Sequence, residues 1–381
     1  MKPKLIHEKS TPIRIPLSAP DITEAEIAAV TAVLRTPRLS LGDKLIEFEN
    51  ALAQFVAAGH CAACSSGTAA LHLALLATGI QPGDEVIVPS FTFVAVANAV
   101  RYLGAIPVFA DIDPLTLNLA PASLEAAITS RTRALIAVHT FGIPAPMSDL
   151  LEIARRHNLK LIEDACESLG GEHHGQKLGA LGHAGVFGFY PNKQITTGEG
   201  GALVTSDPQI ASRARMLRNQ GRGTANEWFE HEEIGYNYRI SEINCALGIA
   251  QLKRIDEILA KRADAAQKYF ANLQNNSNLH LPPMQIAHGK ISWFVYVVRL
   301  AEQFGAEDRD RVAAELQSRG IACGRYFAPI HRQRAYRDVP DRCMDLSVTD
   351  AVAPRTLALP FFNQITSEQI DEVCRALCEA L

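Results

Sequence analysis

A lysine stands between an aromatic segment and a glycine-rich turn, in a setting that suits amine chemistry. Lys193 follows the residues VFGFY (186–190) and precedes GEGG (198–201). A lysine that attacks a carbonyl must be a free amine near neutral pH, and a desolvated site lowers its pKa enough for this. We interpret Lys193 as a candidate Schiff-base lysine. A solvated loop lysine beside a simple hairpin turn would show the same local pattern.

An acid closes the apolar segment LKLIED (159–164). Asp164 could bind a metal, cap a helix or pair with the ring nitrogen of a pyridine cofactor. In the last case the carboxylate keeps the ring nitrogen protonated, so that the ring can accept electrons from a substrate C–H bond. Acids at strand ends are common in α/β folds, so Asp164 alone leaves these three roles open.

A small polar cluster, Ser65-Ser66-Gly67-Thr68, precedes an Ala/Leu-rich segment with helical character. The start of a helix offers unpaired N–H groups and the positive end of the helix dipole, and Thr68 adds a hydroxyl. These groups suit a phosphate dianion. An ordinary Ser/Thr helix cap would look the same, and for this motif taken alone it is the favoured reading.

Short apolar runs alternate with helical stretches from about residue 20 to 250, which predicts a mostly parallel sheet with helices on both faces. The strands are expected at 85–89, 106–111, 134–140, 159–164, 186–190 and 201–207, and the helices at 69–78, 123–129 and 147–157. The last strand follows its neighbour so closely that it is expected to pair antiparallel. Ligands of such sheets bind at the carboxyl ends of the strands, where Asp164 falls.

A long amphipathic stretch, Ser241 to Asn275, predicts a helix that links this large domain to a smaller one. The strand-like WFVYVVRL (293–300), a helix near 306–319, the segment GIACGRYF (320–327) and a helix at 366–380 follow it. This order indicates a smaller α+β domain. We therefore divide the chain into a large domain at 1–250, which includes the N-terminal segment, and a small domain at 251–381.

Composition excludes several classes of protein. The chain has 381 residues, 48% apolar, with a net charge of −4 and no Lys/Arg run, so neither nucleic acid nor an anionic membrane is an expected partner. No apolar stretch reaches the roughly 20 residues of a membrane span, and the first residues lack a signal-peptide core. We expect a cytoplasmic protein with no metal site. Cys61-Ala-Ala-Cys64 has redox or zinc spacing but lacks a second ligand pair, so we interpret the eight cysteines as reduced thiols.

Taken in order, the motifs SSGT (65–68), VPSFTF (88–93), EDACES (163–168), the lysine segment and GYNYR (235–239) resemble the DegT-type (DnrJ/StrS-like) sugar aminotransferases. The resemblance extends from PLSAPDITEAE (16–26) through SWFVYVVRL (292–300) to APIHRQRAY (328–336) and LALPFF (357–362). It implies fold-type I architecture and the cofactor pyridoxal 5'-phosphate (PLP). No GxGxxG or GxxxxGK[ST] motif supports a dinucleotide or nucleotide fold instead.

The resemblance implies a role for each matching residue in the cofactor site. Lys193 matches the Schiff-base lysine and Asp164 the acid on the pyridine nitrogen. The other matches are Glu167 beside the phenolic oxygen of the ring, Phe93 stacked on the ring, Gly67 and Thr68 at the phosphate, and Asn237 at the phosphate of a neighbouring subunit's cofactor. The last match implies a homodimer with shared active sites. His331 and Tyr326 are expected to contact the sugar nucleotide.

The implied reaction moves an amino group from glutamate to a keto-sugar nucleotide, of the 4-keto-6-deoxy type, to make an amino sugar for a surface polysaccharide or related glycan. Glu167 within EDACES resembles the subgroup that makes 4-amino sugars such as perosamine. Another PLP reaction on the same fold, such as dehydration or epimerisation, and a non-catalytic regulator are the alternatives. Relatives that act as dehydratases carry histidine in place of the lysine, so Lys193 argues against that reaction.

One position departs from the family pattern. Relatives commonly have Phe-Ser-Phe before the lysine, with the serine on the phosphate, whereas this chain has Gly188 there. Another hydroxyl or a water must take over that contact, or phosphate binding is weaker. Substrate specificity is expected to lie in residues 221–233, in 326–336 and in the partner subunit.

Overall fold

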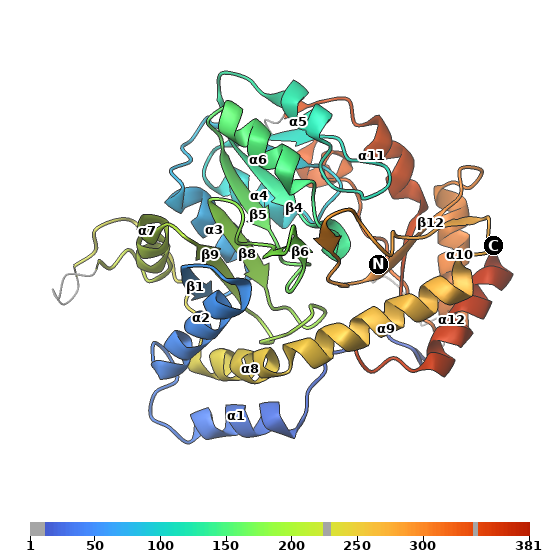
Figure 1. Cartoon of the computed structure of the whole chain (residues 1–381), viewed down its shortest axis with the longest axis horizontal. Helices are drawn as coiled ribbons and strands as arrows, with labels where there is room; N and C mark the ends of the chain where they lie inside the picture. Colours follow the sequence, from blue (N-terminus) through green and yellow to red (C-terminus); the bar gives the residue numbers. More distant parts are fainter. Residues whose placement is uncertain (1–11, 224–229, 338–341) are drawn as a thin grey trace, which may run out of the picture.

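The computed structural model describes residues 12–223, 230–337 and 342–381. In this part of the chain eight strands form one large sheet, in the order β1-β9-β8-β5-β4-β2-β3-β13 (Figure 1). The strands are β1 (His60–Cys64), β2 (Glu85–Pro89), β3 (Ile106–Ala110), β4 (Thr132–Val138), β5 (Lys160–Asp164), β8 (Ala184–Gly188), β9 (Gly201–Thr205) and β13 (Arg342–Cys343). The predicted α/β class with a mostly parallel sheet is confirmed.

The pairing of the strands follows from the lengths of their connections. Strands β8, β5, β4, β2 and β3 run parallel, because a helix or long crossover separates successive members. Strand β9 pairs antiparallel with β8, as predicted. Strand β1 pairs antiparallel with β9 and was not predicted, because its sequence His-Cys-Ala-Ala-Cys resembles a metal or redox motif more than a strand. Cys61 and Cys64 are free and buried there.

Helices cover both faces of the large sheet because its strands carry apolar side chains on both sides. Val86 and Val88 pack toward one face with α3, α4 and α7, whereas Ile87 packs toward the other with α5 and α6. Beyond them on this second face, α2 and α8 cover β1 and β9. The helices are α2 (Asp43–Val56), α3 (Gly67–Ala77), α4 (Ala95–Tyr102), α5 (Pro121–Ala127), α6 (Met147–Arg156), α7 (Pro208–Arg218) and α8 (Glu242–Lys253).

A second core forms around a small antiparallel sheet in the order β10-β12-β14, as expected for an α+β unit. Its elements are α9 (Ile255–Leu273), β10 (Leu279–His280), β12 (Tyr296–Leu300), α10 (Ala306–Ser318), α11 (Ser347–Val352), β14 (Thr356–Leu359) and α12 (Ser367–Ala380). Ile15, from the segment before α1 (Glu24–Leu34), packs into this core. A third small sheet, β11-β6-β7, combines β6 (Glu172–His173) and β7 (Gln176–Lys177) with β11 (Gly289–Lys290).

The prediction of one continuous helix from Ser241 to Asn275 is wrong, because the chain forms two helices there. The chain leaves the helical conformation at Arg254, with φ −106° and ψ 8°, so α8 and α9 are separate helices (Figure 1). The Arg254 side chain turns back to the carboxylates of Asp21 and Glu26, at 3.2 and 3.0 Å, and these contacts stabilise the break. The domain division at residue 250 stays a prediction.

Glu26 on helix α1 (Glu24–Leu34) is the buried centre of this network. Burial alone would raise its pKa, but hydrogen bonds from Thr23, Gln251 and Arg254 lower the pKa of Glu26 to about 2. The ionised carboxylate therefore stabilises the fold above its ordinary pKa, and the contribution is lost as the pH falls toward 2.

We expect Glu26→Gln to lower the free energy of unfolding at pH 7 by about 3 kcal/mol, from the size of the pKa shift. Urea unfolding followed by circular dichroism measures this loss. The difference between wild type and variant should shrink between pH 4.5 and pH 2, because the wild-type carboxyl is then protonated as well. A difference that does not depend on pH would contradict the assigned charge.

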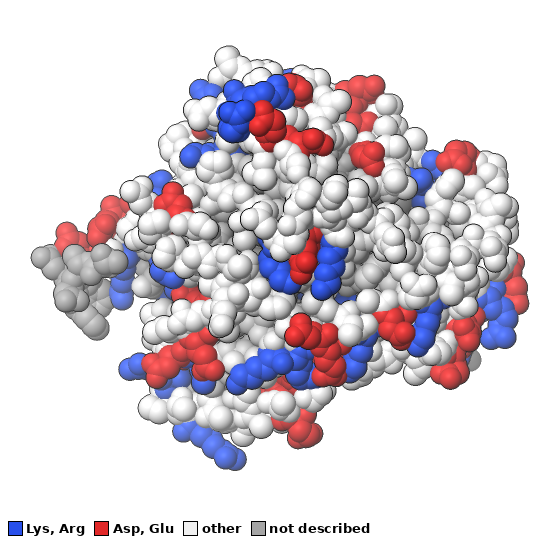
Figure 2. Space-filling view, in the orientation of Figure 1, with Lys and Arg blue, Asp and Glu red and all other residues white. Residues whose placement is uncertain are grey.

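Charged side chains of both signs are interspersed over the face seen in Figure 2, in keeping with the small net charge. Among the described residues no helix has the length and apolar character to cross a membrane. Nor does this part of the chain gather three or more histidine, cysteine or acidic side chains into a group that could hold a metal ion.

Candidate functional site

The predicted site residues follow the carboxyl ends of three strands of the large sheet. Asp164 is the last residue of β5, Phe93 comes shortly after β2, and Lys193 lies in the loop after β8. Strands β8, β5, β4 and β2 are consecutive neighbours and run parallel, so their carboxyl ends meet at one edge. This edge is where an open α/β sheet binds its ligand.

Lys193 is held by a loop that is tied at both ends. Its backbone N–H donates to the Tyr190 carbonyl at 2.9 Å, and the Thr197 N–H donates to the Phe189 carbonyl at 3.0 Å. The side chain is only 16% exposed. Its Nζ atom lies 3.6 Å from Glu167 Oε1 and 4.0 Å from the centre of the Phe294 ring. The amine is therefore fixed between a carboxylate and an aromatic face.

Asp164 lies close to Lys193. Its carboxylate is buried, and Oδ1 accepts the backbone N–H of Cys166 at 3.0 Å, which fixes the orientation of the group. Both Asp164 and Lys193 affect the pKa of Cys166 and that of Glu167 through their charges, so all four side chains are close to one another. The fold thus brings the predicted lysine and acid together across 29 residues of sequence.

Glu167 is the most constrained group of the site. Its Oε2 accepts the Phe141 backbone N–H at 2.9 Å, and its backbone carbonyl accepts Gln194 Nε2 at 2.6 Å. Burial raises the pKa of the Glu167 carboxyl, and the nearby Lys193 amine and the Phe141 N–H only partly oppose this. Burial therefore favours the neutral carboxyl, 3.6 Å from the Lys193 amine.

We expect Glu167→Gln to stabilise the cofactor-free protein at alkaline pH. Because the folded pKa is raised, the carboxyl stabilises the fold below its ordinary pKa, and this contribution is lost as the pH rises through the folded value. Glutamine removes the cost of a buried charge and keeps the acceptor for Phe141. The melting temperature at pH 8 should rise by about 1 °C, as expected for about 1 kcal/mol in a chain of 381 residues. At pH 4 the gain should vanish, and an equal gain at both pH values would contradict the ionised carboxylate.

The phosphate end of the site is built from the start of α3. Ser66 caps this helix, with Oγ accepting the Ala69 N–H at 3.1 Å, so the ordinary helix cap is present. The Thr68 hydroxyl and the first N–H groups of the helix remain as phosphate donors. A Cβ atom at Gly67 would lie 2.9 Å from Cys166 Sγ and 3.3 Å from the Gly188 backbone, so only glycine allows this close approach.

Cys166 also explains how the chain tolerates Gly188. A Cβ atom at position 188 would lie 3.3 Å from Cys166 Sγ, in space that the thiol already borders. No hydroxyl can therefore come from position 188, and the residues present leave Thr68 and the α3 N–H groups to bind the phosphate. Burial raises the pKa of Cys166, so it packs here as a neutral thiol.

These residues fit a flat, phosphorylated pyridine ring. Phe93 is 59% exposed although its neighbours after β2 are buried, so its ring is free to stack on a ligand. Asp164 offers a carboxylate to a ring nitrogen, Lys193 an amine to an aldehyde, and Gly67 a close approach to a phosphate. The donor set therefore fits PLP, the cofactor that the sequence indicates.

Asn237 is exposed, as a contact to a neighbouring subunit requires. Its segment runs beside the end of α7, where the Tyr236 and Tyr238 N–H groups donate to the Leu217 and Arg218 carbonyls at 2.7 and 3.0 Å. The Tyr238 carbonyl accepts the Ser65 N–H at 2.8 Å, which places Asn237 near the phosphate loop. The contact across a subunit boundary stays a prediction.

The two predicted substrate residues lie differently. Tyr326 is close to the site, because its hydroxyl bonds the Asn192 side chain and its pKa, raised mainly by burial, also responds to Glu167. His331 uses both ring nitrogens within the chain, to Ser90 Oγ at 2.7 Å and Asp350 Oδ1 at 3.1 Å. A ligand could bond His331 only by displacing one of these partners. Part of the predicted specificity region, residues 224–229, lies outside the described residues.

Sequence reasoning missed several residues of the site. Gln194 donates through Nε2 to the Glu167 carbonyl and to Ser292 Oγ, and Phe294 lies under the Lys193 amine. Buried polar residues on either side of Lys193 were a usable signal for Gln194. No local signal exists for Phe294, which is 101 positions away from Lys193. Only the packing of the segment before β12 against the lysine loop brings it there.

A family model described as the DegT/DnrJ/EryC1/StrS aminotransferase family matches residues 20–378. A GDP-perosamine synthase of Caulobacter vibrioides is 42% identical over 370 residues, 97% of this chain and 98% of that protein. The spore coat polysaccharide biosynthesis protein SpsC of Bacillus subtilis is 36% identical, covering 95% of this chain and 96% of its own.

Solved structures show the same fold. S. venezuelae DesV superposes with a TM-score of 0.89 at 35% identity, covering 97% of this chain and 98% of its own. The PLP form of the putative sugar aminotransferase Spr1654 from Streptococcus pneumoniae has a TM-score of 0.91 at 27% identity, with 96% and 99% covered. The similarity therefore extends over nearly the whole chain.

Proposed function

Because this chain belongs to the DegT/DnrJ/EryC1/StrS aminotransferase family, we propose that it transfers the amino group of glutamate to the C4 keto group of a GDP-linked 4-keto-6-deoxy sugar. The chain is a PLP-dependent aminotransferase that acts on a nucleotide-linked sugar. The observation that carries the proposal is that Lys193, Asp164 and Glu167 lie close together at the carboxyl ends of β5 and β8. Lys193 argues against the dehydratase alternative, because dehydratases of this family have histidine there.

The nature of the sugar rests on the relatives. Two GDP-perosamine synthases, from Caulobacter vibrioides and Escherichia coli O157:H7, match at 42% and 33% identity over nearly the whole chain. Perosamine is a 4-amino-4,6-dideoxy sugar, in agreement with the subgroup indicated by Glu167 in EDACES. We propose that the product enters a surface polysaccharide and that the reaction takes place in the cytoplasm, where nucleotide sugars are available.

Bound PLP supplies an electron sink and an aldehyde carbon that can carry the amino group. We assign Lys193 Nζ as the base that would take the proton from the α-carbon of glutamate and as the acid that would deliver it to the former aldehyde carbon of the cofactor. In the second half-reaction Lys193 would remove that proton and deliver one to C4 of the sugar. The Phe294 ring and the Glu167 carboxyl hold the amine in place between these steps.

Other residues orient the cofactor and the substrate. The Asp164 carboxylate would hold the ring nitrogen protonated, Phe93 would stack on the ring, and Gly67 and Thr68 at the start of α3 would hold the phosphate. The hydrogen bond from Phe141 to Glu167 and that from Gln194 to the Glu167 carbonyl keep the Glu167 carboxyl directed at Lys193. Tyr326 and His331 are the proposed sugar-side residues.

A screen of keto-sugar nucleotides tests the function. The holoenzyme is incubated with glutamate carrying heavy nitrogen and with GDP-, dTDP- or UDP-linked 4-keto-6-deoxy sugars, and label transfer is followed by mass spectrometry. We expect label in the GDP-linked product, with k~cat~/K~M~ at least tenfold above that of the other two nucleotides. Preferred transfer to the dTDP- or UDP-linked sugar would overturn the GDP assignment, and no transfer to any keto sugar would overturn the function.

We also propose a homodimer with shared active sites. The helix α1 and the start of α2 expose large apolar side chains on consecutive segments: Ile27, Leu34, Leu39, Leu41 and Ile46, each 45–59% exposed. This patch adjoins the site, because the Leu39 carbonyl accepts the Glu242 N–H at 3.0 Å and Asn244 on α8 bonds the turn after Lys193. Apolar surface beside an active site is typical of a protein interface.

Mixed dimers test the shared site. We expect Lys193→Ala and Asn237→Ala homodimers each to lose most activity, Asn237→Ala by about tenfold for one lost phosphate contact. Mixing the two variants under exchange conditions creates dimers with one intact site, so activity should recover to a fraction of the wild-type value. Pairing Lys193→Ala with Lys193→Arg is the control and should stay inactive. Equal activity of mixed and unmixed variants would show that Asn237 does not act across the subunits.

A further inference from the structure

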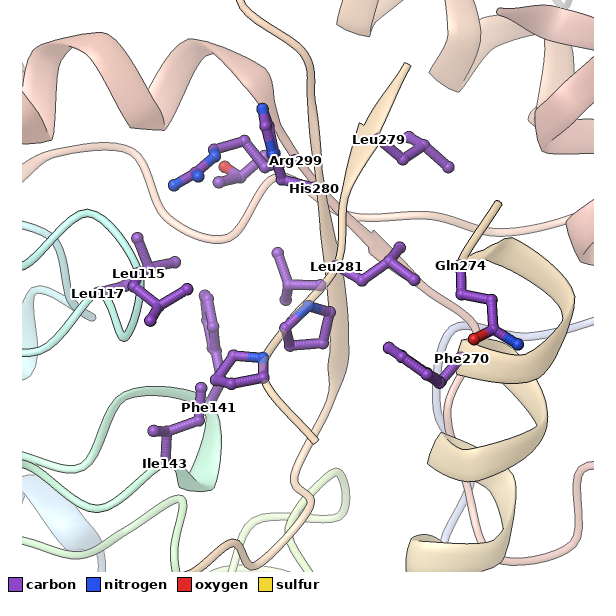
Figure 3. A pocket seen from close by; sticks show the side chains of 14 residues that line it. Leu115, Leu117, Phe141, Ile143, Phe270, Gln274, Leu279, His280, Leu281 and Arg299 are labelled. Atoms are coloured by element: carbon purple, nitrogen blue, oxygen red, sulfur yellow. The ribbon is translucent and has the colours of Figure 1, made fainter. Parts of the chain in front are cut away.

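A cavity lies between loops of the large sheet and the small sheet, with Phe141 in its wall (Figure 3). Its volume is about 390 Å³, enough for a small organic molecule. It is lined by Leu115, Leu117, Phe141 and Ile143 from the large sheet's loops and by Phe270, Gln274, Leu279, His280, Leu281, Pro282, Pro283, Val297, Arg299 and Thr356 from the small sheet and its neighbours. None of these residues has a role in the proposed reaction except Phe141.

The walls of this cavity are mainly apolar. Figure 3 shows Leu115, Leu117 and Ile143 on one side and Leu279, Leu281 and Phe270 on the other. Leu115 is 65% exposed, which is unusual for a leucine that lies where the parts of the protein around the large and the small sheet meet. Burying such side chains under an apolar ligand is favourable, at about 25 cal/mol per Å² of apolar surface removed from water.

Among the described residues of the wall, only Arg299 on β12 has a buried polar atom without a hydrogen-bond partner. Its Nη1 donates to the Pro114 carbonyl at 2.6 Å, but its Nε is shielded from solvent and has no acceptor in the described part of the chain. The nearby acid, Glu302, already bonds His280 and Arg355. Burial lowers the pKa of Arg299, and Arg355 adds like-charge repulsion. Arg299 nevertheless keeps a positive charge in the wall of the cavity, and an anion in the cavity can pair with it.

The cavity is connected to the active site through one residue. The Phe141 side chain forms part of its wall, while the Phe141 backbone N–H bonds Glu167 Oε2. Phe141 has a φ of +58°, in the left-handed region that is rare for a bulky residue. The next residue, Gly142, packs against the Ser292 carbonyl, where a Cβ would lie 1.7 Å away, and its own carbonyl accepts the Ser292 N–H at 3.0 Å. A ligand that presses on the Phe141 ring can therefore act on the backbone N–H that holds Glu167.

We propose that this cavity is an effector site for a small organic anion with an apolar body. The anionic group pairs with Arg299, and the apolar body lies against the leucines and Phe141. Binding displaces Phe141 and weakens the hydrogen bond to Glu167, so the effector changes how the site holds the Lys193 amine. The binding site itself does not depend on the proposed sugar substrate.

The charge of the ligand provides the first test, with the PLP-loaded protein as it exists. The fluorescent probe 8-anilinonaphthalene-1-sulfonate, an apolar anion, should bind with one site per chain. Octanoate should displace it at least about tenfold more effectively than octanol or octylammonium, because only the carboxylate gains a charged hydrogen bond. If octanoate, octanol and octylammonium displaced the fluorescent probe equally well, the role of Arg299 would be overturned without any variant.

Variants provide the second test. Arg299→Met should weaken octanoate binding at least tenfold, Arg299→Lys should keep part of the affinity, and Arg375→Met, an exposed arginine on α12, should leave it unchanged. Because Arg299→Met also removes the bond to Pro114, its melting temperature is compared with that of Arg299→Lys. Loss of affinity in Arg375→Met to the same extent would overturn the site.

The link to the active site has its own readout. Saturating octanoate should shift the pH at which the wild-type cofactor absorbance titrates, because Glu167 faces Lys193. In Glu167→Gln the shift should be absent although octanoate still binds. Binding without any spectral shift in the wild type would leave a plain binding site and overturn the effector role. This outcome is independent of the substrate screen, so failure of one proposal is distinguishable from failure of the other.

Discussion

Replacing Lys193 by alanine should abolish turnover, with a loss of at least about 10⁴-fold, because the variant lacks both the amine that binds the cofactor aldehyde and the base that moves the proton. The structure makes this side chain hard to replace. Its Nζ is held between Glu167 and the Phe294 ring, and no other lysine of the described residues shares that position. Single-turnover measurements with glutamate provide the rate.

Absorbance provides an independent readout of the same variant. The lysine-bound cofactor absorbs at the edge of the visible range, and Lys193→Ala should lose this band even when PLP is bound through its phosphate and ring. Lys268→Ala, which removes an exposed lysine on α9, is the matched control and should keep both the band and the rate. Full activity of Lys193→Ala would refute the assigned chemistry.

Asp164→Asn should give the second largest effect. Asparagine has nearly the same shape and keeps an oxygen to accept the Cys166 N–H, so the local structure is preserved. It cannot hold the ring nitrogen protonated, so the ring becomes a poorer electron sink. We expect k~cat~ to fall by about 10³-fold, equivalent to about 4 kcal/mol of transition-state stabilisation.

The matched comparison separates chemistry from folding. The melting temperature of cofactor-free Asp164→Asn should stay within about 1 °C of the wild type, a margin of about 1 kcal/mol for a chain of 381 residues. Asp149→Asn, on the first turn of α6, is the control for a carboxylate outside the site and should keep the wild-type rate. If Asp164→Asn kept the full rate of proton transfer, Asp164 would not face the ring nitrogen.

Most strands of the large sheet could be predicted, because the types of residue within each strand indicate it without reference to distant parts of the chain. The run 159–164 contains Leu159, Leu161 and Ile162 and ends in an acid, so it could be recognised as a strand with a functional end. Strand β1 was missed because its five residues are small and contain two cysteines, and its extended shape depends on pairing with β9. The break at Arg254 was missed because the apolar periodicity continues across it, and only contacts with Asp21 and Glu26 define it.

The resemblance placed the charged centre of the site, and the structure brings its members together. Lys193, Asp164 and Glu167 lie on consecutive loops of parallel strands, so their proximity follows from the strand order. Phe294 and Gln194 were missed for different reasons. Gln194 was overlooked beside a lysine, whereas Phe294 comes from the small sheet and no spacing rule connects it to residue 193.

By itself the sequence determined which chemistry this protein can carry: a lysine after an aromatic segment, an acid at a strand end and a helix start that can receive a phosphate. Tertiary structure alone decided which groups surround the Lys193 amine and how Gly188 and Cys166 pack together. It also decided that Arg299 and Phe141 line one cavity. The physical reason is that motifs are set by neighbours along the chain. Desolvation and packing depend on residues that only folding brings within a few ångströms.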